Sequence, residues 1–397
     1  MLPPALPQIR SPGQSRTKAL IQEQASELGL VAVRFAGVEP LHDARRFLED
    51  WVTQGWHGPL GYLAQPSVRS DPRTLMPGAK TVMVAAGQLP GIPEDPRDRG
   101  PVAAVARFAR YSDYHSVIRA ALERLAEALG RIVGRPVEYR VCVDSAPLME
   151  RPLAARAGLG FFADSTLLLV PGVGTHAVLG ELIVDVELEP DPPLLRSCRK
   201  CGACQRSCPT SALRAPGRLE ARRCVACLNQ QRGQVPRAFR AAMGHWIYGC
   251  DHCQNVCPEN SQPRSRVGDS AALGPARSTP SWQDLLWTRG QAWTRWVNGT
   301  PLGRVSRTLL ARNAAVALGN TEDDLASRLL LPVLAEHPSA LVRAHAAWAL
   351  GQWPRPAVRQ ALDRARSQDP DGSVRLEAEA VLACGPSGTR AADSRPT

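Results

Sequence analysis

The chain has 397 residues, of which 44% are hydrophobic and 21% charged, and its 48 basic residues against 37 acidic ones give a net charge of +11. This composition excludes collagen-like, coiled-coil and disordered proteins, and the length leaves room for two or three globular domains. The positive charge suggests an anionic partner such as nucleic acid, although arginine-rich proteins of GC-rich genomes carry a similar excess.

The N-terminal segment 1–15 is rich in proline, and we expect it to be disordered. Its sequence MLPPALPQIRSPGQ lacks the basic-then-apolar order of a secretory signal. No later stretch approaches the ~18 uncharged apolar residues that span a bilayer. The sequence therefore predicts a cytoplasmic protein that does not contact membranes.

Residues 16–192 are predicted to form an α/β domain, because apolar, β-branched runs alternate with stretches of helical periodicity. The clearest helix starts after the N-cap residue Asp113 and continues to Gly130. The proline- and glycine-rich stretch 87–101 is expected to be a surface loop. The other expected helices cover 17–28 and 147–158, and the expected strands cover 31–35, 81–86, 139–143, 166–170 and 178–186.

Asp144 is the most prominent polar residue of this domain, because it follows an apolar strand and precedes a proline-containing turn. Sites in α/β folds often lie at the carboxyl ends of strands, which favours a catalytic role. Aspartate is also a common turn-former, so a purely structural role is the alternative. No G-x-G-x-x-G motif follows a strand, so a dinucleotide cofactor is not expected.

Nine of the 11 cysteines lie between Cys198 and Cys257, which points to metal binding rather than disulfides in a chain without an export signal. The first motif has the ferredoxin spacing Cys-x2-Cys-x2-Cys-x3-Cys-Pro, in which three thiolates bind one four-iron cluster and the fourth binds the neighbouring cluster. Structural zinc is the alternative, although zinc sites do not usually follow this spacing. The cysteines of this motif are Cys198, Cys201, Cys204 and Cys208.

A second motif, Cys250-x2-Cys253-x3-Cys257-Pro, contains only three cysteines. A second complete cluster therefore needs one more ligand from between the motifs, and Cys224 and Cys227 are both candidates. With that ligand, the segment 193–262 is predicted to hold two four-iron clusters in a ferredoxin-like domain.

From Arg304 onward the pattern is purely helical. The segments 309–319, 341–351 and, more weakly, 373–382 match one another at intervals of 32 residues. We interpret 304–385 as HEAT-like repeats, with an ordinary helical bundle as the alternative, 263–303 as a helical linker and 386–397 as a disordered tail. Arg312 and Arg343 recur on successive helices, and we expect them to contact phosphates.

Short motifs in a fixed order cover most of the chain. They are ARFA (106–109), DYH (113–115), VDSAP (143–147), ERPLA (150–154), AGLG (157–160), LGEL (179–182), ARRC (221–224) and YGCD (248–251). Together with the spaced cysteines, this series resembles the epoxyqueuosine reductases, cobalamin-dependent iron–sulfur enzymes that complete queuosine at the wobble position of tRNA. The resemblance implies a cobalamin-binding α/β domain, a two-cluster domain and C-terminal repeats that grip tRNA.

The resemblance also implies how the cysteines are shared, because it selects Cys224 rather than Cys227 as the missing ligand. One cluster would be bound by Cys198, Cys201, Cys204 and Cys257. The other would be bound by Cys208, Cys224, Cys250 and Cys253.

The family's proton donor falls on Asp144. By this resemblance the clusters would reduce cob(II)alamin to cob(I)alamin, which attacks the epoxide-bearing ring while Asp144 protonates the leaving oxygen. Burial beside the corrin is expected to raise the pKa of Asp144 and keep it protonated. The other residues expected near cobalamin are Arg69, Tyr114, His115, Ala226 and Asp251, although His115 is explained equally well as a packed helix-start residue.

Two segments depart from the family pattern. The pair Ala163-Asp164 stands where the family has a lysine-containing motif, and 224–231 is CVACLNQQ in place of CISYLTIE. A paralogous corrinoid reductase of another substrate is therefore one alternative, and an electron-transfer ferredoxin without chemistry of its own is another. The expected partners are an epoxyqueuosine-containing tRNA and an external one-electron donor, and we expect the protein to be a monomer.

Overall fold

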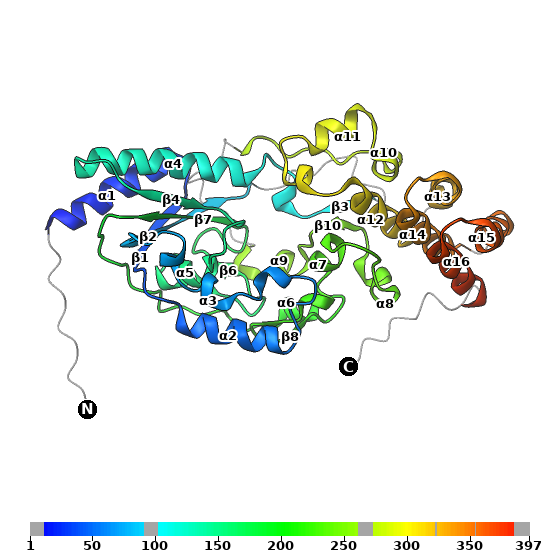
Figure 1. Cartoon of the computed structure of the whole chain (residues 1–397), viewed down its shortest axis with the longest axis horizontal. Coiled ribbons are helices and arrows are strands. Elements are labelled where there is room, and N and C mark those ends of the chain that lie inside the picture. Colours follow the sequence, from blue (N-terminus) through cyan, green and yellow to red (C-terminus); the bar gives the residue numbers. More distant parts are fainter. Residues whose placement is uncertain (1–11, 91–101, 261–272, 322–323, 354, 385–397) are drawn as a thin grey trace.

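The computed structural model describes residues 12–90, 102–260, 273–321, 324–353 and 355–384. The α/β domain lies at one end of an elongated molecule, the cysteine-rich segment lies in the middle, and a stack of helices forms the other end (Figure 1). The predicted tail 386–397 and most of the N-terminal segment 1–15 lie outside the described residues, as do 91–101 of the predicted loop and 263–272 of the linker. None of the helices in the described ranges is long and apolar enough to cross a membrane.

A four-stranded sheet forms the centre of the N-terminal domain, in the order β1-β2-β7-β4 with every pair antiparallel. Alternate residues of β2 point to opposite faces, so Met83 and Ala85 enter one hydrophobic core while Val82 and Val84 enter the other. Helices α1 and α4 cover the first face and α5 covers the second (Figure 1). The bounds are β1 Ala32–Ala36, β2 Thr81–Gln88, β4 Tyr139–Cys142, β7 Ala177–Val184, α1 Pro12–Glu27, α2 His42–Thr53, α3 Pro66–Arg69, α4 Tyr114–Val133 and α5 Glu150–Arg156.

Several predicted boundaries shift for local reasons. Helix α1 starts at Pro12 rather than at 17, because proline fits the first turn of a helix, where its missing amide hydrogen costs nothing. The predicted strand 166–170 shortens to β6 (Leu168–Leu169), which pairs with β5 (Phe161–Phe162) outside the main sheet. Because the main sheet is antiparallel, the rule for carboxyl ends of parallel strands does not explain where Asp144 lies.

Helix α4 lies close against the sheet because glycines face it. A Cβ atom at Gly180 would lie 2.5 Å from Ile118 and 2.9 Å from Leu122, and one at Gly87 would lie 2.7 Å from Ile118. The predicted N-cap of this helix is present, since the Asp113 carboxylate accepts a hydrogen bond from the His115 amide at 3.1 Å. The close packing and the cap together fix the first turn of α4 beside the end of β4.

The cysteine-rich segment consists of short elements joined by turns. Its strand β10 pairs in parallel with β3 (Ala104–Val105) of the N-terminal domain, so backbone hydrogen bonds join the two parts. The bounds in this segment are α6 Ala203–Arg206, β8 Leu213–Ala215, β9 Arg218–Leu219, α7 Val225–Gln230, α8 Arg237–Arg240, β10 Trp246–Tyr248 and α9 His252–Asn255.

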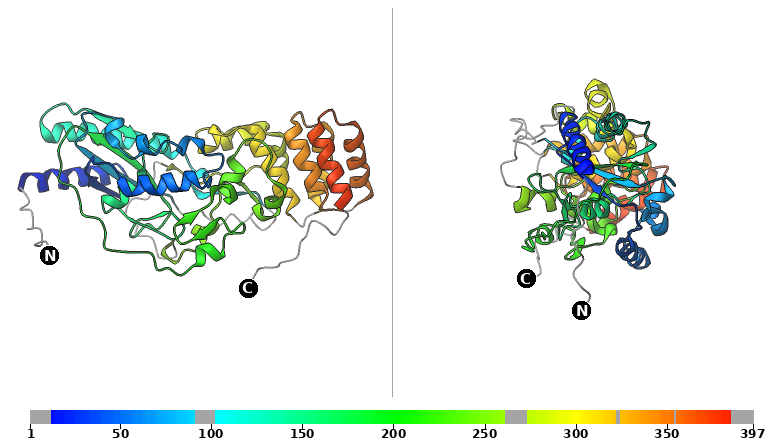
Figure 2. Two further views of the ribbon diagram at one scale, coloured as in Figure 1. Left: turned by 60° about the horizontal axis from the view of Figure 1, so that its bottom comes forward. Right: turned by 90° about the vertical axis from the view of Figure 1, so that its left-hand side faces the viewer.

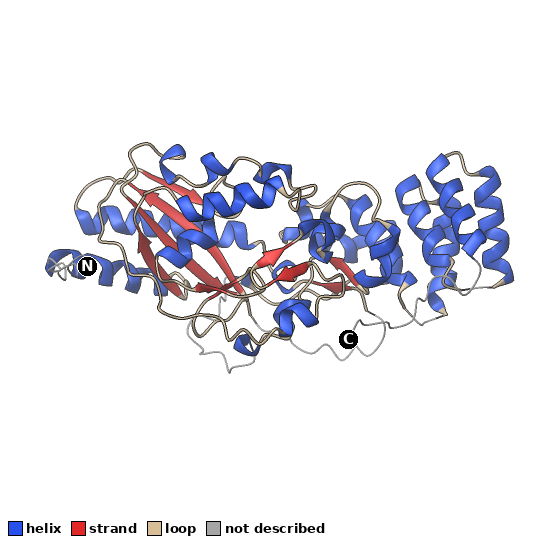
Figure 3. Cartoon of the chain, turned by 90° about the horizontal axis from the view of Figure 1, so that it is seen from below, coloured by secondary structure: helices blue, strands red, loops and turns tan. Residues whose placement is uncertain are grey.

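Helices from α10 onward form the linker and the repeats. Figure 2 and Figure 3 show the last helices standing side by side as a regular stack. The three matching sequence segments fall on α12, α14 and α16, and the helices between them complete the pairs. The bounds are α10 Trp282–Trp287, α11 Gly290–Val297, α12 Arg307–Gly319, α13 Leu325–Glu336, α14 Ala340–Leu350, α15 Pro356–Gln368 and α16 Gly372–Cys384.

The expectation that Arg312 and Arg343 contact phosphates is wrong. Arg312 is 0% exposed, and its guanidinium donates hydrogen bonds to backbone carbonyls of the segment 228–233. Arg343 is also buried and pairs with Asp369 at 2.8 Å. The expectation failed because an arginine inside a helical repeat is usually a surface residue. Here α12 packs against backbone carbonyls of the cysteine-rich segment that need hydrogen-bond donors.

The same position in three successive repeats carries a residue that binds the cysteine-rich segment. Asn313, His345 and Glu377 follow one another at 32-residue intervals, and all three are buried. Asn313 donates to the carbonyls of Asn229 and Ile247, and the His345 ring accepts the Val235 amide hydrogen at 3.1 Å. Glu377 accepts hydrogen bonds from Arg237 and Arg240. The repeats and the cysteine-rich segment therefore share one continuous core.

Candidate active site

Asp144 occupies a sharp turn directly after β4. Its φ is +57°, in the left-handed region that only a few residue types other than glycine enter readily. The Ser145 amide donates to the Val143 carbonyl within this turn, and the Asp144 amide donates to the carboxylate of Glu150 at the start of α5. The Asp144 side chain is 61% exposed and faces outward from the end of the sheet.

Two side chains from the first turn of α4 reach the Asp144 carboxylate. Tyr114 donates its hydroxyl at 3.0 Å, and Nε2 of His115 lies at 3.2 Å from the same oxygen. The two rings stack with centroids 4.1 Å apart. On the other side of the imidazole, Nδ1 of His115 lies 2.6 Å from Asp113, whose second oxygen pairs with Arg304 at 2.9 Å. The result is a chain of contacts from the linker to Asp144.

The hydrogen bonds and charges along this series of contacts shift the pKa values of Asp144 and His115. Hydrogen bonds from His115 and then from Tyr114 hold the pKa of Asp144 below its usual value, although burial opposes them. Burial lowers the pKa of His115, but its bonds to Asp144 and Asp113 outweigh burial and raise it overall. The protein's own groups therefore favour the ionised form of Asp144 and the protonated form of His115, whose Nε2 lies one hydrogen bond from the carboxylate. The expected rise in the pKa of Asp144 depends on burial beside the corrin and stays a prediction.

Two further carboxyl groups lie beneath this turn. Glu181 stands on the central strand β7, is 0% exposed, and lies against Glu150. Burial, followed by the charge of Asp144, raises the pKa of Glu150 to about 7, and burial with the charge of Glu150 raises the pKa of Glu181 well above its usual value. Neither residue was assigned a role from the sequence. An ionisable residue inside the apolar strand 178–186 was the signal that could have found Glu181.

Side chains from several elements lie near the exposed Asp144 carboxylate, and we call this part of the surface the mouth. Tyr62 is 64% exposed, and the Arg69 guanidinium lies 5.7 Å from its ring. Burial raises the pKa of Tyr62, with Asp144 and Cys227 adding to the effect, so both of those groups lie within range of its hydroxyl. Arg69 also supports the turn, because its backbone carbonyl accepts the Met149 amide hydrogen at 3.1 Å.

Ala226 and Asp251, the remaining residues expected near cobalamin, lie in different surroundings. Ala226 is half-buried on α7, one residue before Cys227 and therefore near the mouth. Asp251 is 4% exposed and bonds the Arg107 amide at 2.7 Å and the Gln254 side chain at 2.8 Å. Asp251 thus ties the cysteine-rich segment to the N-terminal domain, and its bonds are not directed at Asp144.

The cysteine thiols fall into two groups by their electrostatic influence on one another, although no three of them in the described part of the chain are already arranged to hold a metal ion. Burial, with Cys224 and Cys208 adding to it, raises the pKa of Cys250 to about 12. The pKa of Cys253 is raised in the same way by burial, Cys250, Cys224 and Cys208. Among the cysteines only Cys224 affects the pKa of Cys227, and Cys227 in turn affects the pKa of Tyr62. This arrangement favours Cys224 as the fourth member of the group.

The second group lies nearer the surface. Burial raises the pKa of Cys257, with Cys198 and Cys201 adding to it, and Cys204 interacts with Cys198. Cys198 and Cys257 pack against Phe161, Ala163 and Leu169 of the N-terminal domain. Cys201 is exposed, whereas the thiols of the first group are more enclosed.

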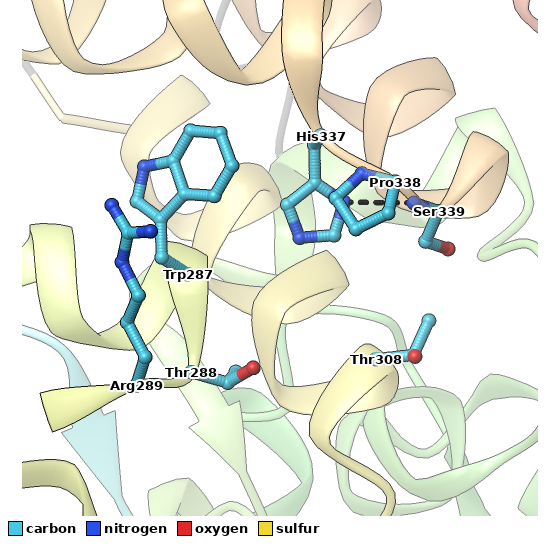
Figure 4. A pocket seen from close by; sticks show the side chains of 7 residues that line it. All are labelled: Trp287, Thr288, Arg289, Thr308, His337, Pro338 and Ser339. Atoms are coloured by element: carbon cyan, nitrogen blue, oxygen red, sulfur yellow. Dashed lines mark hydrogen bonds between the residues drawn. The ribbon is translucent and has the colours of Figure 1, made fainter.

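A separate cleft of about 540 Å³ lies where the linker meets the repeats (Figure 4). The Arg289 guanidinium lies 5.0 Å from the centre of the Trp287 ring, and the Ser339 amide donates to Nδ1 of His337 at 3.1 Å. No residue expected to act in catalysis or cofactor binding lines this cleft. The lining residues are Trp287, Thr288, Arg289, Thr308, His337, Pro338 and Ser339.

Known proteins share this arrangement over nearly the whole chain. Residues 69–145 match the family model described as "Epoxyqueuosine reductase QueG, DUF1730", 197–260 match the 4Fe-4S double cluster binding domain, and 306–383 match HEAT repeats. The epoxyqueuosine reductase of Alicycliphilus denitrificans strain K601 is 39% identical over 354 residues, which is 84% of this chain and 97% of that relative. The chain belongs to the epoxyqueuosine reductase family. The corresponding enzyme of Pseudomonas aeruginosa strain PAO1 is 36% identical over 356 residues, covering 87% of this chain and 97% of that relative.

Solved structures of epoxyqueuosine reductases have the same fold. One, described with an epoxyqueuosine-modified tRNA-Tyr stem loop, has a TM-score of 0.80 at 28% identity and covers 93% of this chain and 99% of its own. Another, from Bacillus subtilis, has a TM-score of 0.81 at 27% identity with the same coverage, and it is described with its catalytic aspartate loop swung out of the active site. The predicted family, the α/β domain, the double-cluster domain and the repeats are thereby confirmed.

Proposed function

We propose that this chain reduces epoxyqueuosine to queuosine at the wobble position of tRNA. The observation that carries this function is 39% identity to an epoxyqueuosine reductase over 84% of the chain. The site agrees with the chemistry, because an exposed carboxylate with two hydrogen-bonding partners lies at the end of the sheet nearest the grouped thiols. The reaction removes one oxygen from the substrate ring, so the protein is an oxidoreductase.

The residues present fit the cofactors of the family. Two sets of four cysteines supply the number and type of ligands that two [4Fe-4S] clusters need, namely Cys198, Cys201, Cys204 and Cys257 in one set and Cys208, Cys224, Cys250 and Cys253 in the other. The open mouth in front of Asp144 is lined by aromatic and basic side chains, and we assign cobalamin to this mouth, near Arg69, Tyr114, His115 and Ala226. When bound, these groups supply the low-potential electrons that the removal of the epoxide oxygen requires.

The protein's own residues supply the protons. Conversion of the epoxide to an alkene consumes two electrons and two protons and releases the oxygen as water. His115, whose Nε2 lies 3.2 Å from Asp144, can protonate the carboxylate, and the exposed Asp144 carboxyl can then pass that proton to the leaving oxygen. The second proton can follow the same route once solvent has protonated His115 again. The hydrogen bond from Tyr114 keeps the Asp144 carboxylate oriented toward both His115 and the leaving oxygen.

Exposed arginines at the start of the repeats replace Arg312 and Arg343 as the proposed tRNA contacts. Arg304 is 53% exposed and bound to Asp113, which places it one side chain from His115. Arg307 is exposed three residues later, and Arg289 is exposed at the cleft that Thr308 also lines. These arginines extend from the active site to the cleft, and a phosphate backbone that enters the mouth can follow them.

The division into a cobalamin-binding domain over 16–192, a cluster domain over 193–262 and repeats over 304–385 stays part of this proposal. The thiol group that contains the exposed Cys201 is the entry point for an external one-electron donor, because electrons pass most readily to a group near the surface. We expect a monomer, since the chain's own helices cover both faces of its sheet. Its tRNA substrate places the activity in the cytoplasm.

The two departures from the family pattern lie at the edge of the site. Ala163 is 5% exposed and packs in the cluster of residues that contacts Cys198 and Cys257, so this departure borders the thiols and not the Asp144 turn. The changed segment 224–231 carries Cys227 toward Tyr62 at the mouth. Neither change removes a group that contacts Asp144, which favours the family's reaction over that of a paralogue with another substrate.

The test is a direct one. Protein purified anaerobically, with reconstituted clusters and added cobalamin, is given a chemical reductant and tRNA that carries epoxyqueuosine, and the nucleosides are then analysed. We expect queuosine to form. A protein that binds its clusters and cobalamin but leaves epoxyqueuosine unchanged would contradict the proposed substrate. Clusters without bound cobalamin would favour an electron-transfer protein.

A further inference from the structure

The turn that carries Asp144 is held in an unfavourable backbone conformation. At φ +57° the Cβ atom of an L-residue crowds the following carbonyl oxygen, so this conformation is less stable than the ordinary ones. The surrounding structure must therefore supply a contact that outweighs this cost. The contact present is the hydrogen bond from the Asp144 amide to the Glu150 carboxylate, which connects the turn to the first residue of α5.

Glu150 is in turn held by Glu181. Glu181 is fully buried on the central strand of the sheet, beside Val84 on one neighbouring strand and Cys142 on the other. Among the described residues no group donates a hydrogen bond to its carboxyl oxygens, and the charge of Glu150 is the largest electrostatic influence on it. A fully buried carboxyl group beside a half-buried one, with no cation between them, favours the form in which one of the two is protonated. A protonated Glu181 can donate to Glu150, while Oε1 of Glu150 accepts the Asp144 amide hydrogen.

The side chains therefore form a column from the core to the mouth. Glu181 is anchored in the sheet, Glu150 lies above it, and the Asp144 turn lies above Glu150. The charged groups that bear on this column are Arg151 on α5, which acts on both Asp144 and Glu150, and His115 on α4, which binds Asp144. A buried carboxyl group on the central strand of an apolar sheet costs stability, so the presence of Glu181 here calls for a function in positioning.

We infer that Glu150 is a positioning residue for the family's reaction, a latch that is held by Glu181 and keeps the Asp144 turn directed into the active site. This inference rests on the proposed role of Asp144 as proton donor. Glu150 touches neither the mouth nor its ligands. It acts through the backbone of Asp144, so the length of its side chain matters more than its charge.

Two conservative variants separate positioning from proton transfer. In Glu150→Gln the amide keeps the reach of glutamate, accepts the Asp144 amide hydrogen with its oxygen and donates to Glu181 with its nitrogen. In Glu150→Asp the carboxyl group is kept, but the side chain is one methylene too short to reach both partners. Glu127→Ala, on the exposed face of α4, is the matched control.

The measurements use the holoenzyme with clusters, cobalamin and substrate tRNA. We expect Glu150→Gln and the control to keep at least half of the single-turnover rate. We expect Glu150→Asp to lose about 10- to 100-fold, the range that one charge-assisted hydrogen bond spans, with iron content, cobalamin binding and the KM for tRNA unchanged. Hydrogen exchange of peptides covering 143–149 should accelerate in Glu150→Asp and stay slow in Glu150→Gln.

The opposite ranking would overturn the inference. An active Glu150→Asp beside an inactive Glu150→Gln would mean that the carboxyl proton itself takes part in the reaction. Equal rates and equal exchange in all variants would mean that nothing is latched. If Glu150→Asp fails to fold, Glu181→Gln and Glu181→Leu provide the same comparison, because only glutamine can still donate to Glu150. A wild-type rate in Asp144→Asn would refute the proton-donor role alone, and the exchange data would still report on the latch.

Discussion

Replacement of Asp144 by asparagine separates its chemistry from its role in the turn. Asparagine enters the left-handed backbone region as readily as aspartate does, so the turn at φ +57° should persist. The amide oxygen can still accept hydrogen bonds from Tyr114 and His115. The variant loses only the ability to take a proton from His115 and release it to the leaving oxygen.

The expected sizes of the two effects differ widely. General acid catalysis typically contributes ~10² to 10⁴ in rate, or about 3 to 5 kcal/mol of transition-state free energy. The side chain is 61% exposed, so its hydrogen bonds contribute about 1 kcal/mol or less to folding. We therefore expect a large loss of turnover together with a change in melting temperature of no more than a few degrees.

The assay measures cobalamin content, iron content, melting temperature and single-turnover rate on one preparation. Asp185→Asn is the control, because its carboxylate likewise accepts a side-chain hydrogen bond, from Arg135 at 2.7 Å, at a position away from the mouth. An Asp144→Asn enzyme with full cofactors and a wild-type rate would refute the argument, and Tyr114 or His115 would then be the next candidate. A destabilised but active variant would identify Asp144 as a turn-former.

Four further predictions test other parts of the structure. Wild-type protein should bind about eight irons and eight sulfides, and Cys224→Ser should lose about half of the iron while Cys227→Ser keeps it; equal losses would contradict the ligand assignment. Arg289→Ala with Arg307→Ala should raise the KM for tRNA and flatten its salt dependence, whereas Arg366→Ala, exposed on α15, should do neither; an unchanged KM would exclude these arginines from tRNA binding. Arg312→Met should cost about 3 to 5 kcal/mol of folding free energy by chemical denaturation, because the carbonyls of 228–233 lose their buried donor, and a cost below ~1 kcal/mol would show that water replaces it. Glu181→Gln should gain stability relative to wild type as the pH rises from 5 to 8. The reason is that the carboxyl pKa values are raised in the folded state, so the stability of the wild type falls as the pH climbs above the unfolded pKa of 4.5. A stability difference that does not change with pH would refute the shared proton.

The sequence carried the parts of the site that depend on local spacing. The ferredoxin spacing grouped the cysteines before any fold was known, and the 32-residue period located the repeats. The N-cap of α4 followed from Asp113 and the periodic residues after it. Asp144 was found at a strand end, but by a rule for parallel sheets that this antiparallel sheet does not obey.

What the sequence missed depends on contacts between distant segments. Glu150 and Glu181 are 31 residues apart in the chain, and nothing in either local pattern reports that they meet. Arg312 looks like a surface residue until α12 is placed against the carbonyls of 228–233. Deletion of 304–397 is consequently no clean test of tRNA binding, because it would also uncover Leu228, Val235 and Met243 of the shared core.

The recurrence of Asn313, His345 and Glu377 limits how this protein can change length. Each of the three residues binds a different, fixed part of the cysteine-rich segment, so the spacing of the repeats must match the spacing of their partners in that segment. An extra repeat inserted between α13 and α14 would move His345 and Glu377 away from their partners by about the 8–10 Å that separates packed helices. A repeat added after α16 would disturb none of the three. Growth of the array, in evolution or by design, is therefore open only at its C-terminal end.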